Sequence, residues 1–269
     1  MLEHPTGYTL LIVVFFGVLV TFLGVRFRFF RLPSSQAWYP ITYLPVLGAF
    51  ATYIGVTVFY PIFIQSVLPF SSDQLGWLNL LYIGLVFALL LLYLACINRN
   101  VVRTIFGRFR LKSVGMGVLT WLISYPYVLI VGTLVMAITN WLWGKAVIEQ
   151  PAVKHLKQMM EYPFVFALTL VGVIMIVPFL EELLFRGFLQ SWMRRFLGRH
   201  GAIVVTALVF ALVHYTPGQE RGNIEIITSL FVLSYFLCFI YERESTLWAP
   251  IALHMTFNAV SCIAVIVSQ

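Results

Sequence analysis

Long apolar runs alternate with short polar connections along the whole chain. Eight apolar segments follow from this pattern, at about residues 8–25, 38–60, 76–97, 114–143, 162–192, 201–216, 224–241 and 247–267. A helix needs about 20 residues to cross the hydrocarbon core of a bilayer, and most of these segments reach or approach that length. Helices are expected because isolated strands would leave backbone groups unpaired in lipid. The pattern predicts an all-α polytopic membrane protein, a bundle of about eight transmembrane helices.

Composition points the same way. Of the 269 residues, 61% are hydrophobic and only 10% are charged, whereas soluble domains carry about 25% charged residues. The net charge of +7 could suggest a nucleic-acid partner, but the sequence contains no nucleic-acid-binding motif. No basic residue precedes the first apolar run, so we expect no cleavable signal peptide. The expected partner is therefore the lipid bilayer, and no nucleic acid.

The basic residues are distributed unevenly between the two sides of the predicted bundle. If the eight segments alternate in direction, 13 of the 17 Lys and Arg residues fall on one side. Cytoplasmic loops of membrane proteins are enriched in Lys and Arg, so we expect these loops to face the cytoplasm and both termini to face away from it. The 13 residues are Arg26, Arg28, Arg31, Arg99, Arg103, Arg108, Arg110, Lys112, Arg186, Arg194, Arg195, Arg199 and Arg243.

The chain shows no soluble domain, internal repeat or low-complexity stretch. We expect a single integral membrane domain over residues 1–269, with four N-terminal spans in residues 1–143. The longest polar stretch, residues 144–161, predicts a short surface helix or loop. The polar motifs described below all fall in residues 162–267, which are expected to form the catalytic core.

Six polar side chains interrupt the apolar segments: Glu181, Glu182, Arg186, His214, His254 and Asn258. An ionised side chain at the bilayer centre costs roughly 2.5–3.5 kcal/mol on insertion scales, so each charge is expected to have a partner or a function. Glu182 and Arg186 are four residues apart on a helix and can neutralise each other. Glu181 points about 100° away from Glu182 around the helix. It is therefore the charge that this pairing leaves unexplained.

The predicted helices can bring several of these residues to one depth. If segments 162–192 and 201–216 form a hairpin that turns near Leu197 and Gly198, Glu181 and His214 lie equally far from the turn. His254 and Asn258 share one face of the last segment, two to three turns from its start. One carboxylate, two imidazoles and one carboxamide are therefore expected to meet within the membrane.

This set of groups suits hydrolysis. A carboxylate in an apolar cavity can act as a general base on water, and a histidine can hold the same water or transfer a proton. A histidine and an asparagine together can donate hydrogen bonds to a tetrahedral oxyanion. Glu181, His214 and His254 could instead bind zinc, and the residues alone leave that alternative open.

Other protease chemistries fit poorly. The chain contains no H-E-x-x-H motif of a zinc protease and no G-x-S-x-G serine elbow. Asp73 is its only aspartate, which excludes an aspartyl dyad.

Three motifs give the chain a specific resemblance. They are "EELLFR" at Glu181–Arg186, "FALVH" at Phe210–His214 and "HMTFN" at His254–Asn258. In this order, each in or beside an apolar segment, they resemble the CPBP family of intramembrane proteases. That family includes the type II CAAX prenyl endopeptidases and bacterial relatives linked to bacteriocin processing and immunity. The resemblance covers about residues 162–267, and the first four spans resemble nothing specific.

The resemblance implies an eight-helix membrane bundle and an intramembrane endopeptidase. Glu181 would activate water with help from His214, and His254 and Asn258 would form the oxyanion hole. Glu182, Arg186 and Phe210 would support them. The family pattern also implies a glutamate-type protease without a cofactor, with zinc as the alternative. Its substrate would be a membrane-anchored protein or peptide, which the motifs do not identify as prenylated or unprenylated.

Two other classes of function use the same features. The first is a membrane scaffold or chaperone that has this fold without proteolysis. The second is a proton-coupled transporter, in which paired intramembrane acids relay protons. Transporters often contain internal repeats, and none is visible here.

Overall fold

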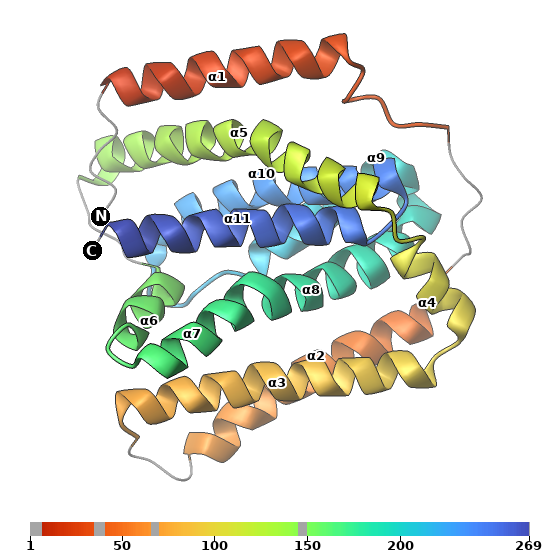
Figure 1. Ribbon diagram of the computed structural model, residues 1–269, viewed down its shortest axis with the longest axis vertical. Helices are drawn as coiled ribbons and strands as arrows, with labels where there is room; N and C mark the ends of the chain where they lie inside the picture. The colour runs from red at the N-terminus through yellow and green to blue at the C-terminus, as the bar shows by residue number, and fades with distance from the viewer. Residues whose placement is uncertain (1–6, 35–40, 66–69, 145–149, 269) are drawn as a thin grey trace.

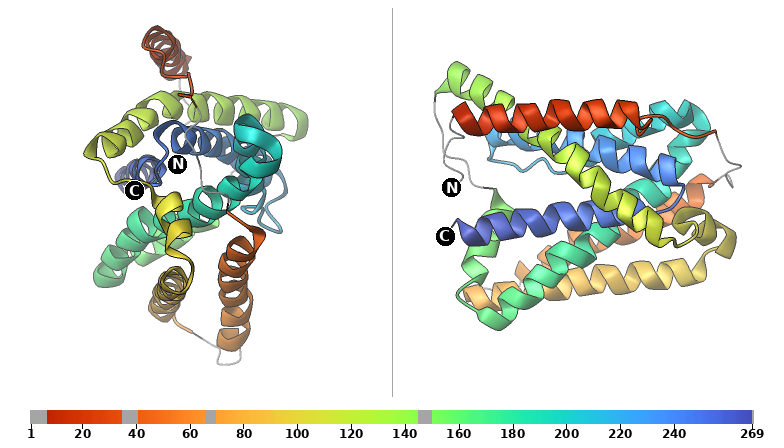
Figure 2. Two further views of the ribbon diagram at one scale, coloured as in Figure 1. Left: turned by 90° about the vertical axis from the view of Figure 1, so that its right-hand side faces the viewer. Right: turned by 45° about the horizontal axis from the view of Figure 1, so that its top comes forward.

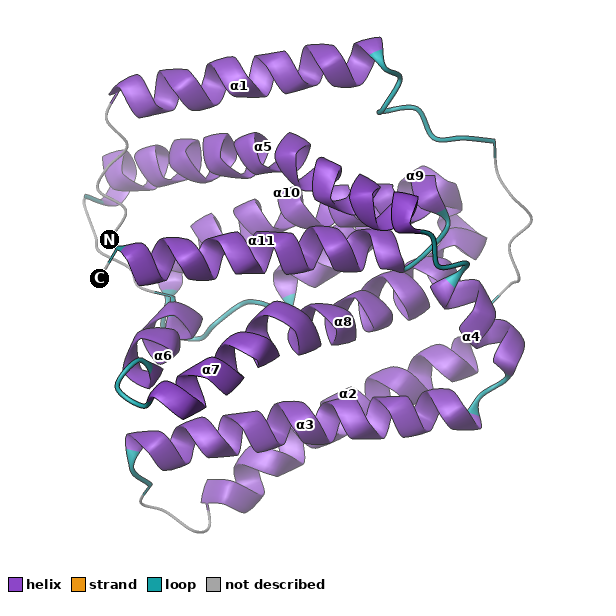
Figure 3. Cartoon of the chain, in the orientation of Figure 1, coloured by secondary structure: helices purple, strands orange, loops and turns teal. Residues whose placement is uncertain are grey.

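The computed structural model describes residues 7–34, 41–65, 70–144 and 150–268. Within these ranges the chain forms helices and their connections, without strands (Figure 3). The prediction of an all-α polytopic membrane protein is confirmed. The helices are α1 (Gly7–Arg26), α2 (Tyr43–Gln65), α3 (Ser72–Cys96), α4 (Arg99–Phe106), α5 (Leu111–Trp143), α6 (Pro151–Met159), α7 (Pro163–Val171), α8 (Val177–Glu182), α9 (Ser191–Leu212), α10 (Glu220–Glu244) and α11 (Trp248–Val267), with the π-helices η1 (Gly172–Ile176) and η2 (Leu183–Gln190).

The number of spans differs from the prediction. Six helical stretches of the described residues are long and apolar enough to cross a membrane, rather than eight. One reason is that two predicted segments belong to the single helical stretch Pro163–Leu212, which bends at Gly198 (φ 64°, ψ −173°). The other is that the described apolar part of α1, Leu11–Arg26, is shorter than a full span. Residues 38–40 of the predicted second segment lie outside the described ranges.

The helix that carries Glu181 lies in the middle of the bundle. Figure 1 shows α1 and α5 on one side of it, α2 and α3 on the other, and α10 and α11 between α5 and α8. The left view of Figure 2 shows the same order. Helix α5 packs along both α10 and α11, whereas α1 packs on α5. The central helices therefore have protein neighbours on both sides, which is where polar side chains of a membrane protein can be paired.

The basic loops gather at one end of the bundle, on the right in Figure 1. Arg199, just after the bend in α9, donates to the carbonyl of Pro33 at 2.6 Å, which ties the bend to the loop after α1. Thr246, in the α10–α11 turn, donates to the carbonyl of Phe106 at the end of α4. These contacts join the four predicted basic loops in two pairs. Helix α4 lies within one of them and was not predicted, because its charged residues read as a connection.

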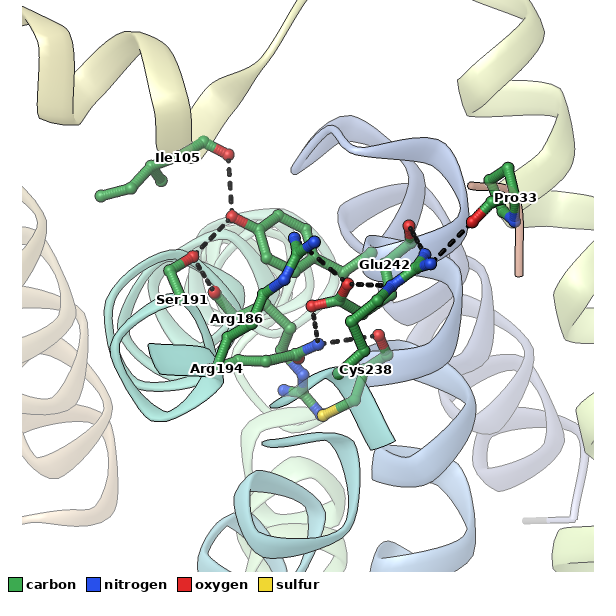
Figure 4. A network of polar contacts seen from close by, with 10 residues as sticks. Pro33, Ile105, Arg186, Ser191, Arg194, Cys238 and Glu242 are labelled. Carbon is green, nitrogen blue, oxygen red and sulfur yellow. Dashed lines mark hydrogen bonds and ion pairs between the residues drawn. The ribbon is translucent and has the colours of Figure 1, made fainter. Parts of the chain in front are cut away.

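A ladder of polar contacts joins η2 and the start of α9 to α10 (Figure 4). Every fourth side chain reaches the residue 48 positions later, so the two helices run parallel and in register. The pairs are Arg186 Nη2 with Ser234 Oγ at 2.6 Å, Gln190 Nε2 with the Cys238 carbonyl at 3.0 Å, and Arg194 Nη1 with Glu242 Oε2 at 3.4 Å.

Glu242 corrects one detail of the sequence interpretation. The predicted seventh segment ends at residue 241 and places Glu242 in a loop, but α10 continues to Glu244 and Glu242 is buried. Its carboxylate contacts Arg194 and Arg199, the latter at 3.1 Å. The hydropathy pattern placed the helix end just before its first charged residue, Glu242. It could not show that the basic partners of Glu242 come from another helix, α9.

The contact between α5 and α11 depends on a glycine. A Cβ atom at Gly117 would meet the carbonyl oxygen of Ala249 and would lie 2.9 Å from the Cβ of Ala252. Gly115, two residues earlier, has open space around the same position. The two helices can therefore approach this closely only because residue 117 has no side chain, as at helix interfaces built on small residues.

We expect Gly117→Ala to destabilise the protein by about 1–3 kcal/mol because overpacking forces α5 and α11 apart. The matched control, Gly115→Ala, should be neutral or stabilising by up to about 1 kcal/mol, since alanine favours helix over glycine. Thermal unfolding in detergent measures both. Equal stability of the two variants would contradict the close approach.

Candidate active site

Glu181 lies between two histidines that come from other helices. Its Oε1 is 3.9 Å from Nε2 of His214, and its Oε2 is 3.7 Å from Nε2 of His254. The side chain of Glu181 is 21% exposed and that of His214 is 31% exposed. The structure therefore brings together three residues of the predicted set, at the end of α8, after α9 and within α11. The site is also accessible from outside the protein.

His214 is oriented by the end of α9. The last residue of the helix is Leu212, and the backbone N–H of His214 bonds to Ala211 rather than continuing the helical pattern. The carbonyl of Phe210 instead accepts a hydrogen bond from Nδ1 of His214 at 2.7 Å. Side chains often satisfy carbonyls left over at helix ends, and here this bond turns Nε2 toward Glu181.

His254 is oriented by the second glutamate. Its Nδ1 lies 2.7 Å from Oε1 of Glu182, and its side chain is only 6% exposed. The same carboxylate oxygen accepts from Nη1 of Arg186 at 3.0 Å. The expected pairing of Glu182 with Arg186 is therefore present, and the sequence did not indicate that this pair also holds His254.

In both histidines the Nδ1 atom is the hydrogen-bond donor. A carbonyl and an ionised carboxylate only accept hydrogen bonds, so Nδ1 of each ring must carry the hydrogen. The Nε2 atoms, which face Glu181, are then hydrogen-bond acceptors when the rings are neutral. Three acceptor groups thus converge on one small region, which suits a donor such as a water molecule.

Arg186 is fully buried and held from three directions. It pairs with Glu182, donates to Ser234 of α10 and places its guanidinium carbon 4.4 Å from the centroid of the Phe210 ring. Ser234 was not among the predicted site residues. Ser234, Cys238 and Glu242 lie at intervals of four residues and so share one face of α10. The sequence alone does not show which helix that face contacts.

Phe210 is the aromatic centre of the site. Its ring lies 4.7 Å from the ring of His214 and 6.1 Å from that of His254, and 5.0 Å from the ring of Phe185 in an edge-on contact. Phe210 is 1% exposed. It therefore packs against both histidines and against Arg186, so that a change in its ring would be transmitted to all three.

Asn258 makes a different contact. Its side-chain Nδ2 donates to the backbone carbonyl of Val173 in η1 at 2.9 Å. The N–H of Val177 donates to Gly172 rather than to Val173, and the next residue, Pro178, has no N–H. The carbonyl of Val173 therefore has no backbone partner in its own helix, and Asn258 supplies one. This bond uses one of the two amide hydrogens and leaves the other.

The zinc alternative requires donors that share one metal position. The described ranges of the chain contain no group of three or more His, Cys, Asp or Glu side chains placed to hold a metal ion. Zinc therefore stays the alternative to a metal-free mechanism, and we derive no step through it.

We expect Asn258→Ala to destabilise the protein by about 1–3 kcal/mol, because the part-buried carbonyl of Val173 loses its only identified donor. Replacing Pro178 by alanine restores a backbone N–H that can serve η1. Pro178→Ala should therefore recover part of the stability in the Asn258→Ala background and have less effect alone. Thermal unfolding of the four proteins gives the coupling energy, and strictly additive effects would contradict this role of Asn258.

One comparison with known proteins identifies this region of the chain. Residues 163–260 match the family model described as Type II CAAX prenyl endopeptidase Rce1-like. No curated protein and no solved structure matches the chain. The matched residues contain Glu181, His214, His254 and Asn258, and they run from the start of α7 into α11. The chain is a multi-pass membrane protein in which residues 163–260 match the Rce1-like model of the type II CAAX prenyl endopeptidases.

Proposed function

We propose that the protein is an intramembrane endopeptidase that hydrolyses a peptide bond in a membrane-anchored protein or peptide. The observation that carries this proposal is the position of Glu181, with its two carboxylate oxygens facing the Nε2 atoms of His214 and His254. The family match supports the same class of reaction. A scaffold would have no need for two imidazoles fixed toward one free carboxylate.

In this proposal Glu181 is the general base. A water molecule donates one hydrogen to the Glu181 carboxylate and the other to Nε2 of His214, which is an acceptor in the neutral ring. The water oxygen attacks the carbonyl carbon of the scissile peptide bond as its proton passes to Glu181. The protonated Glu181 then delivers that proton to the leaving nitrogen as the carbon–nitrogen bond breaks, so water is consumed and an acid and an amine are formed.

The tetrahedral intermediate carries a negative oxygen that needs donors. His254 can donate from Nε2 only when both ring nitrogens are protonated, because Nδ1 already donates to Glu182. Asn258 has one amide hydrogen left after its bond to Val173. Both residues can therefore support an oxyanion, with His254 as the charged donor.

The substrate class and orientation follow from the membrane setting. We propose a membrane-anchored substrate, and a prenylated C-terminal peptide is the first to test because the family model describes prenyl endopeptidases. We also place the end that carries Arg199 and Arg243 in the cytoplasm, because Lys and Arg are enriched in cytoplasmic loops. Reaction with a membrane-impermeant label at single introduced cysteines tests this orientation.

We expect Glu181→Gln to lower the cleavage rate by about 100- to 10,000-fold, since an amide cannot accept the proton from water. The matched control is Glu161→Gln, which removes an exposed carboxylate outside the site. The measurements are cleavage of a farnesylated peptide in proteoliposomes and a comparison of membrane peptides from cells with each variant.

Each alternative gives a distinct result. Full complementation of a null strain by Glu181→Gln would favour the scaffold. Proton-coupled uptake into proteoliposomes would favour the transporter. Cleavage by Glu181→Gln at the rate of the unmodified protein would overturn the proposal.

We expect cleavage to survive treatment with a zinc chelator followed by gel filtration, because this mechanism uses no metal. The rate before and after treatment is the measurement, and total metal content is determined on the same samples. Loss of activity that is restored by added zinc would replace the general-base reading with a metal site at Glu181, His214 and His254.

A further inference from the structure

A cluster of hydroxyl groups lies on α2 and α3, outside the residues matched by the family model. The Oγ1 of Thr57 and the hydroxyl oxygen of Tyr82 are 2.8 Å apart. The hydroxyl of Thr57 also donates to the backbone carbonyl of Tyr53 at 2.9 Å. We call Tyr53, Thr57 and Tyr82 the hydroxyl cluster. Neither the motifs nor the mechanism above uses it.

Two contacts fix the position of this cluster relative to Glu181. At the basic end, Arg195 donates to the carbonyl of Ile41 at 3.1 Å. Further along, the ring of Phe50 packs against Phe185 with centroids 5.8 Å apart. Between the two contacts the residue number rises from 41 to 50 on the α2 side and falls from 195 in α9 to 185 in η2. Helix α2 therefore runs antiparallel to this part of the central helix. One turn beyond Phe50 is Tyr53, which therefore lies opposite the turn that holds Glu181.

The surroundings of Tyr53 agree with this register. Tyr53 and Tyr82 pack against the apolar cluster that contains Leu180 and Leu183, the residues on either side of the two glutamates. Helix α3 reaches the same helix through Phe87 and Phe179, whose ring centroids are 5.8 Å apart. The hydroxyl cluster is thus part of the wall around Glu181.

The cluster also has hydrogen-bonding capacity that suits a peptide. Each hydroxyl has one donor and two acceptor positions, so the bonds of Thr57 to Tyr82 and to the Tyr53 carbonyl leave hydroxyl positions of the cluster open. Thr57 is exposed in the structure. An extended peptide in a membrane has backbone N–H and C=O groups that need partners, and here such partners lie beside the carboxylate that would attack it.

We propose that Tyr53, with Thr57 and Tyr82, binds the backbone of the substrate peptide next to the scissile bond. This inference rests on the proposed endopeptidase function and assigns part of substrate binding to the N-terminal spans. The hydroxyl cluster holds the peptide against Glu181, and the Rce1-like residues carry out the hydrolysis. The competing reading is that the cluster only joins α2 to α3.

The test compares Tyr53→Phe and Tyr60→Phe in the full-length protein in proteoliposomes. Both changes remove one hydroxyl from α2, but the Tyr60 hydroxyl donates to the carbonyl of Leu78 and lies outside the cluster. The probe is a fluorescent farnesylated peptide. For Tyr53→Phe we expect KM to rise about 3- to 10-fold with kcat within about twofold, the effect of one lost hydrogen bond. Tyr60→Phe should leave both constants unchanged.

A binding measurement separates substrate contact from structure. In the Glu181→Gln background, Tyr53→Phe should weaken binding of the same peptide by a similar factor. Its unfolding temperature should be no lower than that of Tyr60→Phe. Unchanged KM and binding for Tyr53→Phe, or an equal effect of Tyr60→Phe, would overturn the inference. When the unmodified protein cleaves the peptide and Glu181→Gln does not, either of these outcomes overturns the inference and leaves the proposed function intact. If cleavage does not depend on Glu181, the proposed function fails first.

Discussion

One oxygen of Glu182 holds the centre of the protein together. Oε1 accepts from Arg186 of its own helix and from His254 of α11, and Arg186 in turn reaches Ser234 of α10 and the ring of Phe210 in α9. Four helices therefore depend on one buried charge pair. Removing one partner of such a pair typically costs about 3–5 kcal/mol, because the remaining charge stays buried without compensation. That cost makes the pair a constraint on the surrounding helices as well as a neutralising contact.

This constraint explains why the two adjacent glutamates behave differently. Glu182 is 0% exposed and its interactions are internal, whereas Glu181 is partly exposed and faces two imidazole nitrogens that have no proton when neutral. The fixed Glu182 orients His254, and the end of α9 orients His214. Glu181 is then left as the carboxylate that can exchange a proton with a bound molecule. Preorganised groups of this kind need no rearrangement when charge develops.

The helix that carries both glutamates is irregular over much of its length, and this irregularity serves the site. π-Helical turns are frequent at functional sites, and η1 and η2 lie directly before and after α8. In each, a side chain donates to a backbone carbonyl, Asn258 to that of Val173 and Ser191 to that of Arg186. The side chains of other turns and helices thus lock a helix that would otherwise be under-bonded in lipid, where unpaired carbonyls are costly.

The sequence by itself determined the membrane class, the helical fold and the residues that carry charge into the apolar core. It could do so because lipid penalises unpaired polar groups so strongly that their positions are informative. It could also place Glu181 and His214 at one depth, because helix length fixes distance from a turn. Only the tertiary structure decided which groups pair. It placed His254 on Glu182, Asn258 on Val173, Glu242 inside the bundle and the hydroxyl cluster of α2 and α3 against the helix that carries Glu181. The periodicity of a single helix gives the direction of a side chain but not the neighbour it meets, since that neighbour is set by how separate helices pack.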